Sequence, residues 1–377
     1  MKAGDGGQPY RIPHVNITVV GAGIVGSAIA YELASRGAGV RLIDSRGVAR
    51  GATRASAGIL APQIEGHIPE LRELAARSLA MYDDFIRRVE RDSRRTIEYK
   101  RNGTLQVALD DQEAAVLADD AQALERNGVE HTLLDRESAR RVAPSLSARV
   151  TSALLVPSHG YVAATALTEA IVDAARARGV RLITSAVRSI EGASATARVA
   201  TDEGIIDSDV VVVASGSWSV ASRPSAGPPV KPIRGQLVQL RCDDALITHV
   251  IWGQDCYLVP WSDGTVLVGA TVEDVGFDER PTAEGVRKLL SAAIRLVPSL
   301  ERAQFEEVRV GFRPKSVDEL PIVGRSETMP SVFYAMGHYR NGVLLAPLTA
   351  ALMADLVLED KERAELALVR PGRLANA

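Results

Sequence analysis

The sequence predicts an α/β fold (α+β overall), in which a βαβ start is combined with a second part built on a mainly antiparallel sheet. Two observations predict it. Within residues 15–44 a buried strand, a glycine-rich turn, an apolar helix and a second strand follow one another, whereas residues 231–319 alternate strands and turns around one helix. The chain has 377 residues, which is long enough for more than one domain.

The composition is that of a soluble globular protein, with 46% hydrophobic and 24% charged residues. The net charge of −3 gives no reason to expect a nucleic-acid or membrane partner. Neither of the two cysteines lies in a CxxC or Cys/His cluster, so we expect no disulfide, no metal site and a reducing compartment. The chain starts without a signal-peptide pattern, and no apolar run approaches the ~20 residues of a membrane span. We therefore expect a cytoplasmic protein without a transmembrane segment.

Residues 15–44 have the pattern of a complete βαβ unit. The run "VNITVV" is typical of a buried strand, and "GAGIVGSAIAYELASRG" adds a G-x-G-x-x-G turn and an apolar helix that ends at Gly37. The run "VRLI" then forms a second strand, and Asp44 follows it about 20 residues after the glycines. Strand, turn, helix and terminal carboxylate all have the order that a dinucleotide site requires.

Each part of this unit has a chemical reason. Gly21 allows the tight turn, Gly23 lets the backbone approach a pyrophosphate, and Gly26 lets the helix pack on the strand. The helix N-terminus faces the phosphate charge, and Asp44 accepts hydrogen bonds from the ribose hydroxyls. A bare G-x-G-x-x-G is weak evidence, and a turn needed only for packing is the alternative. The agreement of all the parts favours a Rossmann-type dinucleotide site.

The rest of the chain alternates helices and strands until a proline-rich segment, residues 223–232, after which strands dominate. Near the C-terminus the polar hexapeptide "GHYRNG" follows a buried strand and precedes an apolar helix that begins at Gly342. Pro347 then falls in the first turns of that helix, where a missing N–H costs little. We expect helices at 71–91, 111–128, 164–178 and 282–296, and strands at 103–108, 180–184, 186–190, 195–200, 210–214, 236–241, 256–260, 266–270, 307–313 and 331–336.

Seven strings occur in a fixed order: "VVGAGIVGSAIAYELASRG", "GATRASAGILAPQ", "VVVASGSWS", "PIRGQLVQL", "YLVPWSDGTVLVGATVE", "GFRPKSVDELPIVG" and "GHYRNGVLLAPLTA". Together they resemble the FAD-dependent D-amino acid oxidase superfamily, and most closely the glycine oxidases of bacterial thiamine biosynthesis. The resemblance runs from about Val15 to Leu358. It implies a D-amino acid oxidase/glutathione-reductase-like fold, with a Rossmann-type FAD-binding domain in three segments (15–95, 150–230 and 320–365). The substrate-binding domain would comprise 96–149 and 231–319, with flexible termini at 1–14 and 366–377.

The resemblance implies a noncovalent FAD. The glycine loop would hold the pyrophosphate, Asp44 and Ser45 the ribose, and the backbone of Val187 the adenine, while the segment from His338 to Leu344 would lie along the flavin ring. A helix N-terminus beside the flavin stabilises the negative charge of its reduced form, which explains a polar hexapeptide at that place. The implied cofactor residues are Gly21, Gly23, Ile24, Val25, Gly26, Asp44, Ser45, Ala52, Thr53, Ala57, Gly58, Ile59, Val187, Gly216, His338, Tyr339, Arg340, Asn341, Gly342, Val343 and Leu344.

On the substrate side the resemblance implies that Arg313 binds a carboxylate, with Tyr257 and Arg340 nearby. A guanidinium fork binds a carboxylate with fixed orientation, and orientation supplies much of the rate when a hydride must reach flavin N5. Structural alternatives remain: Arg313 could pair with Asp318 or Glu319, Arg340 could be a surface ion-pair partner, and Tyr257 could be a core residue. The mechanism requires no protein base, so His338 would only line the flavin, and whether His67 or Asp255 touches substrate stays open.

These residues suit oxidation of glycine or another small amino acid, such as sarcosine or D-alanine, to an imine. Hydrolysis then gives glyoxylate or another 2-oxo acid and ammonia, dioxygen is reduced to hydrogen peroxide, and the product serves thiazole synthesis for thiamine. The alternative is a D-amino acid dehydrogenase that passes electrons to a quinone or another carrier. An NAD-linked enzyme would leave "GATRASAG" without a role. A homo-oligomer is expected only by analogy with the family.

Overall fold

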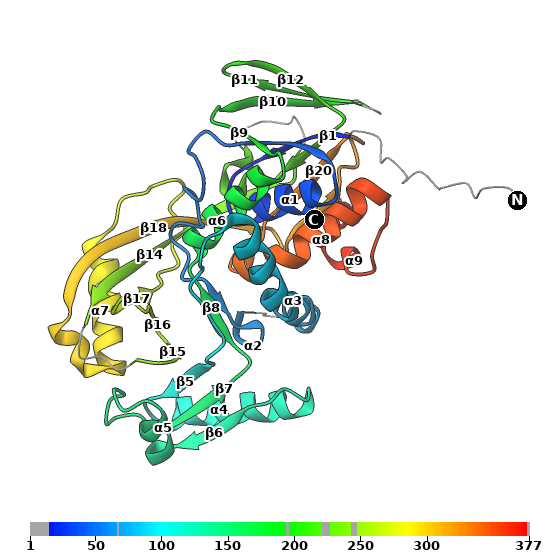
Figure 1. The fold of residues 1–377 in the computed structure, drawn as a ribbon. Helices are drawn as coiled ribbons and strands as arrows, with labels where there is room; N and C mark the ends of the chain where they lie inside the picture. Colours follow the sequence, from blue (N-terminus) through cyan, green and yellow to red (C-terminus); the bar gives the residue numbers. More distant parts are fainter. Residues whose placement is uncertain (1–14, 66–67, 194–195, 221–226, 243–246, 375–377) are drawn as a thin grey trace, which may run out of the picture.

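The computed structural model describes residues 15–65, 68–193, 196–220, 227–242 and 247–374. Two large sheets form the body of the molecule, and the chain passes between them several times (Figure 1). The mixed α/β class and the mainly antiparallel second part are confirmed.

The first sheet has six strands in the order β19-β20-β13-β1-β2-β9. All neighbours are parallel except the pair β19 and β20, which is antiparallel. Parallel strands connected through helices are typical of a doubly wound nucleotide-binding architecture. The strands are β1 (Asn16–Val20), β2 (Gly39–Ile43), β9 (Arg181–Ile183), β13 (Val210–Val213), β19 (Ile322–Arg325) and β20 (Val332–Met336). A three-stranded antiparallel sheet of β10 (Val187–Gly192), β11 (Ala197–Thr201) and β12 (Gly204–Ser208) lies at the top of Figure 1.

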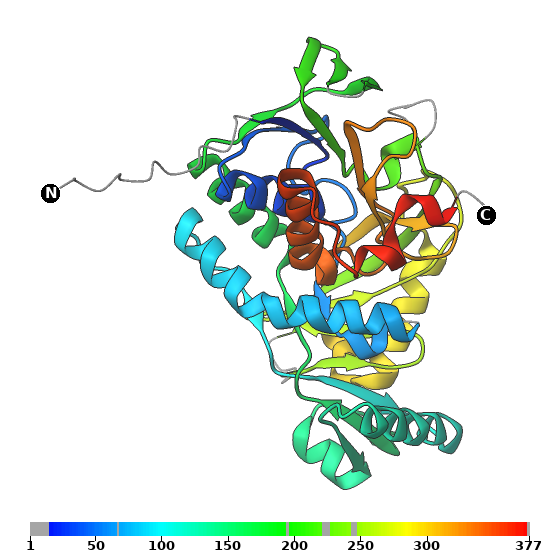
Figure 2. The same ribbon diagram turned by 90° about the vertical axis from the view of Figure 1, so that its right-hand side faces the viewer.

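Four helices pack together beside the parallel sheet: α1 (Ile24–Ser35), α3 (Pro69–Ser93), α6 (Ala164–Ala177) and α8 (Gly342–Glu359). Figure 2 shows α3, in light blue, running beside the orange-red α8. Most residues of α1 and α8 are buried, which explains why both helices are apolar on all sides. Within the described residues, α8 is the one helix long and apolar enough to span a membrane. The expectation that no run reaches this length was wrong, but the burial of α8 accounts for its composition.

Pro347 lies in the second turn of α8 and cannot donate the hydrogen bond that the carbonyl of Val343 would accept in an unbroken helix. The hydroxyl of Tyr82 in α3 donates to that carbonyl oxygen instead, at 2.5 Å. Burial raises the pKa of Tyr82 well above its ordinary value, so the hydroxyl remains protonated and can donate. The proline is tolerated because a neighbouring helix satisfies the carbonyl that it leaves free.

The second large sheet has eight strands in the order β18-β14-β17-β16-β15-β5-β7-β6. Only the pair β15 and β5 is parallel. The long strands β18 and β14 are paired along nearly their whole length and reach up to the parallel sheet (Figure 1). The strands are β5 (Thr104–Ala108), β6 (Thr132–Asp135), β7 (Ser152–Val156), β14 (Val230–Arg241), β15 (Val250–Trp252), β16 (Tyr257–Pro260), β17 (Thr265–Gly269) and β18 (Gln304–Ser316). The helices that accompany it are α4 (Asp111–Arg126), α5 (Arg136–Val142) and α7 (Ala283–Leu296).

A small sheet joins the two parts: β3 (Ile59–Leu60), β8 (Gly160–Val162) and β4 (Tyr99–Lys100), with α2 (Pro62–Glu65) directly after β3. Because β7 pairs with β5 and β6, we propose that the boundary expected at residue 150 lies after Val156. Residues 366–374 were expected to be flexible but form two short helices, α9 (Leu366–Val369) and η3 (Pro371–Leu374). Leu366 and Val369 are buried, and Arg373 pairs with Asp318, so this segment packs against the body of the protein.

Candidate active site

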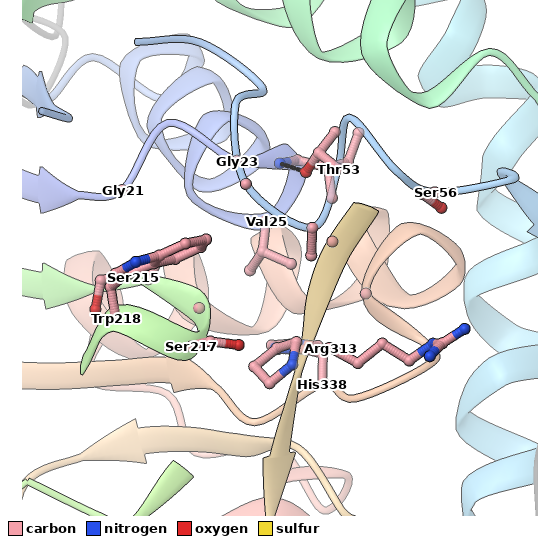
Figure 3. A pocket seen from close by; sticks show the side chains of 18 of the residues that line it. Gly21, Gly23, Val25, Thr53, Ser56, Ser215, Ser217, Trp218, Arg313 and His338 are labelled. Atoms are coloured by element: carbon pink, nitrogen blue, oxygen red, sulfur yellow. Dashed lines mark hydrogen bonds between the residues drawn. The ribbon is translucent and has the colours of Figure 1, made fainter. Parts of the chain in front are cut away.

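A cavity of about 340 Å³ lies where the two large sheets meet. Its lining comes from segments far apart in sequence: the glycine turn, the loop 51–59, the start of β10, the loop 214–218, the strands β14, β16 and β18, and the GHYRNG hexapeptide. Figure 3 shows side chains from these segments around the hollow. Every implied cofactor and substrate residue lies in this lining except Gly26, Asn341 and Leu344.

The glycine turn after β1 is shaped by close backbone packing. Gly21 has φ +110°, and a Cβ atom there would lie 2.4 Å from the carbonyl oxygen of Ala214. Gly23 is the N-cap of α1, and the N–H of Ile24 donates to Thr53 Oγ1 at 3.1 Å (Figure 3). The first turn of α1 carries no acidic side chain, so its positive end is available to an anion.

Asp44 ends β2 and is held by the backbone around it. One carboxylate oxygen accepts the N–H of Ala22 at 2.8 Å, and the other accepts the N–H groups of Arg46 and Gly47 at 2.7 and 3.1 Å. A carboxylate has about four acceptor sites, so one is left for a hydroxyl of a bound ribose. Asp44 and Ser45 both line the cavity.

Two serine hydroxyls in the lining, Ser185 Oγ and Ser215 Oγ, are buried and have no hydrogen-bond partner among the described residues. Buried polar groups usually have partners, so both hydroxyls are suited to a polar ligand in the cavity. Gly58, with φ +66°, lies against β8, and a Cβ there would lie 1.8 Å from the carbonyl oxygen of Val162. These features fit an extended dinucleotide with polar groups along its length.

The GHYRNG hexapeptide connects β20 to α8. Gly337 and Tyr339 both have positive φ, +69° and +48°, and the N–H of Tyr339 donates to the carbonyl of Pro314 at the end of β18 at 2.9 Å. Asn341 is the N-cap of α8, whose first residues, Gly342 and Val343, line the cavity. The first turn of α8 has no acidic side chain, so a second positive helix end faces the same cavity.

His338 also lines the cavity, but its ring is buried and Nε2 lies 3.1 Å from Thr349 Oγ1. Burial lowers the pKa of His338 to about 4, so the ring is neutral at physiological pH. A group with so low a pKa is a weak base, in keeping with a residue that lines the cofactor.

Arg313 projects from β18 into the cavity (Figure 3). Its Nη1 donates to the carbonyl oxygen of Thr271 at 3.0 Å, and its guanidinium lies over Gly235, where a Cβ atom would be 2.5 Å from Nη1. The pairing with Asp318 or Glu319 that was the structural alternative does not occur, because those carboxylates pair with Arg373 and Lys315. Among the described residues, Thr271 is the one hydrogen-bond partner of the guanidinium, so its other N–H groups can bind a ligand in the cavity.

Tyr257 at the start of β16 also lines the cavity. The ring of Tyr257 lies over Gly269 of β17, where a Cβ atom would be 2.4 Å from the ring carbons. The centroid of the same ring lies 5.1 Å from that of the Trp252 ring. Arg340 lines the cavity from the hexapeptide. The structure therefore brings two arginines and a tyrosine to the lining of one cavity.

The three implied cofactor residues outside the lining have other surroundings. A Cβ at Gly26 would lie 2.0 Å from the carbonyl oxygen of Gly21, so this glycine lets helix and turn pack closely. Asn341 and Leu344 are buried in the first turn of α8. Asp255 pairs with Arg295 and does not line the cavity, whereas His67 lies outside the described residues.

Several lining residues were not singled out from sequence: Arg46, Ser185, Ser215, Trp218, Gly235 and Gly311. A glycine inside a strand often marks a close approach, so Gly235 and Gly311 carried a usable signal. The serines lie in segments whose turns were recognised but whose side chains could not be placed. Among the described residues, no group of three or more His, Cys, Asp or Glu side chains could hold a metal ion.

The family model described as FAD dependent oxidoreductase (DAO) matches residues 16–356. The chain belongs to this family. The fold class, the resemblance and the expectation of FAD as cofactor are thereby confirmed, and the glycine turn, Asp44, the unpartnered serine hydroxyls and two helix N-termini fit that cofactor.

Several named relatives align with nearly the whole of this chain. The chain is 35% identical to the bifunctional protein ThiO/ThiG of Nostoc sp., with 92% of this chain and 53% of that protein aligned. It is 33% identical to a glycine oxidase of Geobacillus kaustophilus, over 93% of this chain and 94% of that protein. The crystal structure of a glycine oxidase from the same species superimposes with a TM-score of 0.90 at 32% identity, covering 94% of this chain and 98% of that one. The chain spans about half the length of the first of these relatives.

Proposed function

We propose that this protein oxidises glycine or another small amino or N-methyl amino acid, such as sarcosine or D-alanine, to the imine. The observation that carries the proposal is the position of Arg313, whose guanidinium lies in the same cavity as the glycine turn and the N-terminus of α8. The names of relatives that align over nearly their full length support an amino acid as substrate.

Arg313 binds the substrate carboxylate in this proposal. One guanidinium nitrogen is held by the carbonyl of Thr271, which fixes the plane of the group before substrate arrives. Tyr257 and Arg340 lie in the same lining and contribute a hydroxyl and a second positive charge. Fixing a small amino acid between such groups can contribute roughly 7–11 kcal/mol through orientation alone.

Bound FAD would supply the acceptor for the Cα hydride and the means to pass both electrons to dioxygen. The residues of the glycine turn, Asp44 and Ser45, and the hexapeptide would hold it. In the overall reaction the amino acid loses the Cα hydride and one amine proton, water hydrolyses the imine to a 2-oxo acid and ammonia, and dioxygen becomes hydrogen peroxide. The N-terminus of α8 stabilises negative charge that develops near it.

No side chain is needed as a base if the amine binds neutral. His338 has its pKa lowered to about 4 by burial and its Nε2 near Thr349, so we assign it to the wall of the cofactor site. We assign dioxygen as the electron acceptor because the relatives that align over nearly their full length are named oxidases. We also propose that the product is used in thiazole synthesis, because ThiO/ThiG proteins are among the relatives. A D-amino acid dehydrogenase that reduces a quinone or another carrier is the competing function.

The test is an anaerobic titration of the FAD-loaded protein with glycine, sarcosine, D-alanine and, as control, L-alanine. We expect loss of the oxidised flavin absorbance with at least one of the first three. No loss with any of them contradicts amino acid oxidation. Oxygen consumption measured against reduction of an artificial dye then decides between the oxidase and the dehydrogenase.

A further inference from the structure

The segment that follows β17 carries the carbonyl that holds Arg313. Thr271 is the second residue after this strand, and its carbonyl oxygen accepts the bond from Arg313 Nη1 at 3.0 Å. Two residues later, Glu273 pairs through both its N–H and its C=O with Arg234 of β14, at 3.0 and 2.8 Å. The short stretch from 271 to 273 is thus bound to β14 as an extra piece of strand.

Side chains tighten this attachment. Glu273 accepts three hydrogen bonds, from Thr271 Oγ1 at 2.5 Å, from Gln236 Nε2 at 2.7 Å and from Arg234 Nη2 at 2.5 Å. Burial by itself raises the pKa of Glu273, but these hydrogen bonds outweigh it and the pKa is lowered. The carboxylate is therefore charged at physiological pH and all its partners are fixed.

The partners of Glu273 are themselves immobile. Arg234 is 3% exposed, and its Nη1 also donates to the backbone carbonyls of Asp278 and Arg280. Gln236 is fully buried, and its backbone N–H donates to Thr271 Oγ1 at 2.8 Å. The network therefore holds Thr271 through its hydroxyl, while its N–H donates to the carbonyl of Gln236 at 3.2 Å. The remaining polar group of Thr271, its carbonyl, points to Arg313.

We propose that Glu273 is a positioning residue for substrate binding: with Arg234 and Gln236 it fixes the carbonyl of Thr271, which in turn sets the plane of the Arg313 guanidinium. The inference rests on the proposed function, because it assigns Arg313 to the substrate carboxylate. Glu273 does not line the cavity and touches neither substrate nor cofactor. Its effect reaches the substrate through one backbone carbonyl and one guanidinium.

The first test replaces Glu273 by Gln in the FAD-loaded protein. Gln places an NH₂ group where the Glu273 carboxylate only accepts hydrogen bonds, so this donor faces the donors of the neighbouring side chains. The segment that carries Thr271 is then held less firmly. We expect KM for the amino acid, and the Kd of acetate read from the flavin absorbance, to rise about tenfold. The limiting rate of flavin reduction and the FAD content should stay within about threefold of the wild-type values.

The chain offers a matched control. Glu306 also accepts from an arginine and a glutamine of β14, Arg241 Nε at 2.6 Å and Gln239 Nε2 at 2.7 Å, at the other end of the paired strands β14 and β18. E306Q should therefore leave KM and the acetate Kd unchanged. Equal effects of E273Q and E306Q would mean that any loss reflects general stability, and would overturn the proposal.

A double-mutant cycle separates positioning from structure. In the Arg313→Ala background, E273Q should cause no further rise in the acetate Kd, because its effect passes through Arg313. Additive effects would overturn the proposal. If E273Q fails to fold, Thr271→Val takes its place, because this change exchanges the hydroxyl for a methyl group of similar size. Thr271→Ser keeps the hydroxyl and should bind acetate like the wild type. If no amino acid reduces the flavin of the wild-type protein, the proposed function is refuted. The acetate Kd values of the variants still test the role of Glu273 in that case.

Discussion

Glycines shape both halves of the cavity, but they make room for different things. On the cofactor side they make room for backbone. A Cβ at Gly21 would lie 2.4 Å from the carbonyl oxygen of Ala214, and one at Gly58 would lie 1.8 Å from that of Val162. Ala214 directly follows β13 and Val162 ends β8, and the N–H of each is bonded to a neighbouring segment, so substitution at either glycine displaces a whole segment of the site.

On the substrate side the glycines make room for functional side chains. A Cβ at Gly235 would lie 2.5 Å from Arg313 Nη1, and one at Gly269 would lie 2.4 Å from the ring of Tyr257. The ends of long side chains can shift, so substitution there should change substrate binding and leave the fold and cofactor site intact. The cofactor half of the cavity therefore depends on the conformation of the main chain, and the substrate half depends on the orientation of a few side chains.

The largest expected effect is that of Gly21→Ala. The substituted residue combines φ +110° with a contact of 2.4 Å to backbone, so the turn that faces the pyrophosphate has to move. We expect the purified protein to retain less than about a tenth of the wild-type FAD, measured by visible absorbance and by titration of the apoprotein with FAD. Amino acid oxidation should fall with it.

Gly37→Ala is the control for this change. Gly37 follows the same helix, has φ +94°, and a Cβ there would meet nothing within 4 Å. It should lower the free energy of unfolding by about 1 kcal/mol and leave FAD binding unchanged. Equal loss of FAD in both variants would mean that backbone strain, and not the close approach to Ala214, explains the result.

Arg313→Ala should give the next largest effect, on substrate alone. Removing the charged partner of a carboxylate costs about 2–5 kcal/mol, which corresponds to roughly 30- to 5,000-fold in kcat/KM. FAD content should not change. Arg309→Ala, four residues earlier in β18, is the matched control, because Arg309 pairs with Glu307 and does not line the cavity. Wild-type turnover in Arg313→Ala would contradict the assignment of the carboxylate site.

Gly235→Ala should have a smaller effect that still separates the two halves. The added methyl group displaces the guanidinium of Arg313, so we expect KM for the amino acid to rise about tenfold with unchanged FAD content. Gly253→Ala is a control, since its Cβ would meet only the side chain of Leu296, at 2.9 Å, outside the cavity lining. Loss of FAD in Gly235→Ala would break the distinction drawn between the halves.

The same difference explains what the sequence could predict. The glycine turn, Asp44 and the hexapeptide were recognised because each is a local pattern whose conformation follows from neighbouring residues. The surroundings of Arg313 follow from the register of β14 and β18, which pairs Ile233 with Arg313 across about 80 residues of chain. The local sequence does not determine which residues of two distant strands pair, so the roles of Gly235 and Thr271 emerged only from the structure.

Elements were predicted or missed for related reasons. Helices and strands with clear periodicity, such as α3 and β1, were found to within two residues. The strands β3, β4 and β8 have two or three residues each and exist through their mutual pairing, so no local pattern indicated them. The strand β14 begins at Val230, six residues before the expected start, because its partner β18 extends the ladder past Pro232.

The effect expected to be smallest on activity concerns the stability of the junction between the two halves, where His159 is fully buried. Its Nδ1 lies 2.6 Å from Thr104 Oγ1 of β5, and its Nε2 contacts Gln63 of α2, which follows the cofactor loop. Burial, with a smaller contribution from the charge of Arg101, lowers the pKa of His159 to about 3. The ring therefore stays neutral in the folded protein at pH values where it is protonated in the unfolded chain.

The sign of the pH dependence follows from this difference. Below about pH 6.5 the unfolded chain binds a proton that folded His159 does not, so the free energy of unfolding falls as pH falls, until the pKa of about 3 is reached. Between pH 7.5 and 5.0 this amounts to about 2 kcal/mol. His159→Gln should be less stable at pH 7.5 but lose about 2 kcal/mol less than wild type over this range, measured by urea unfolding at saturating FAD. Identical losses in the two proteins would mean that His159 is protonated in the folded state and that the junction is open to water.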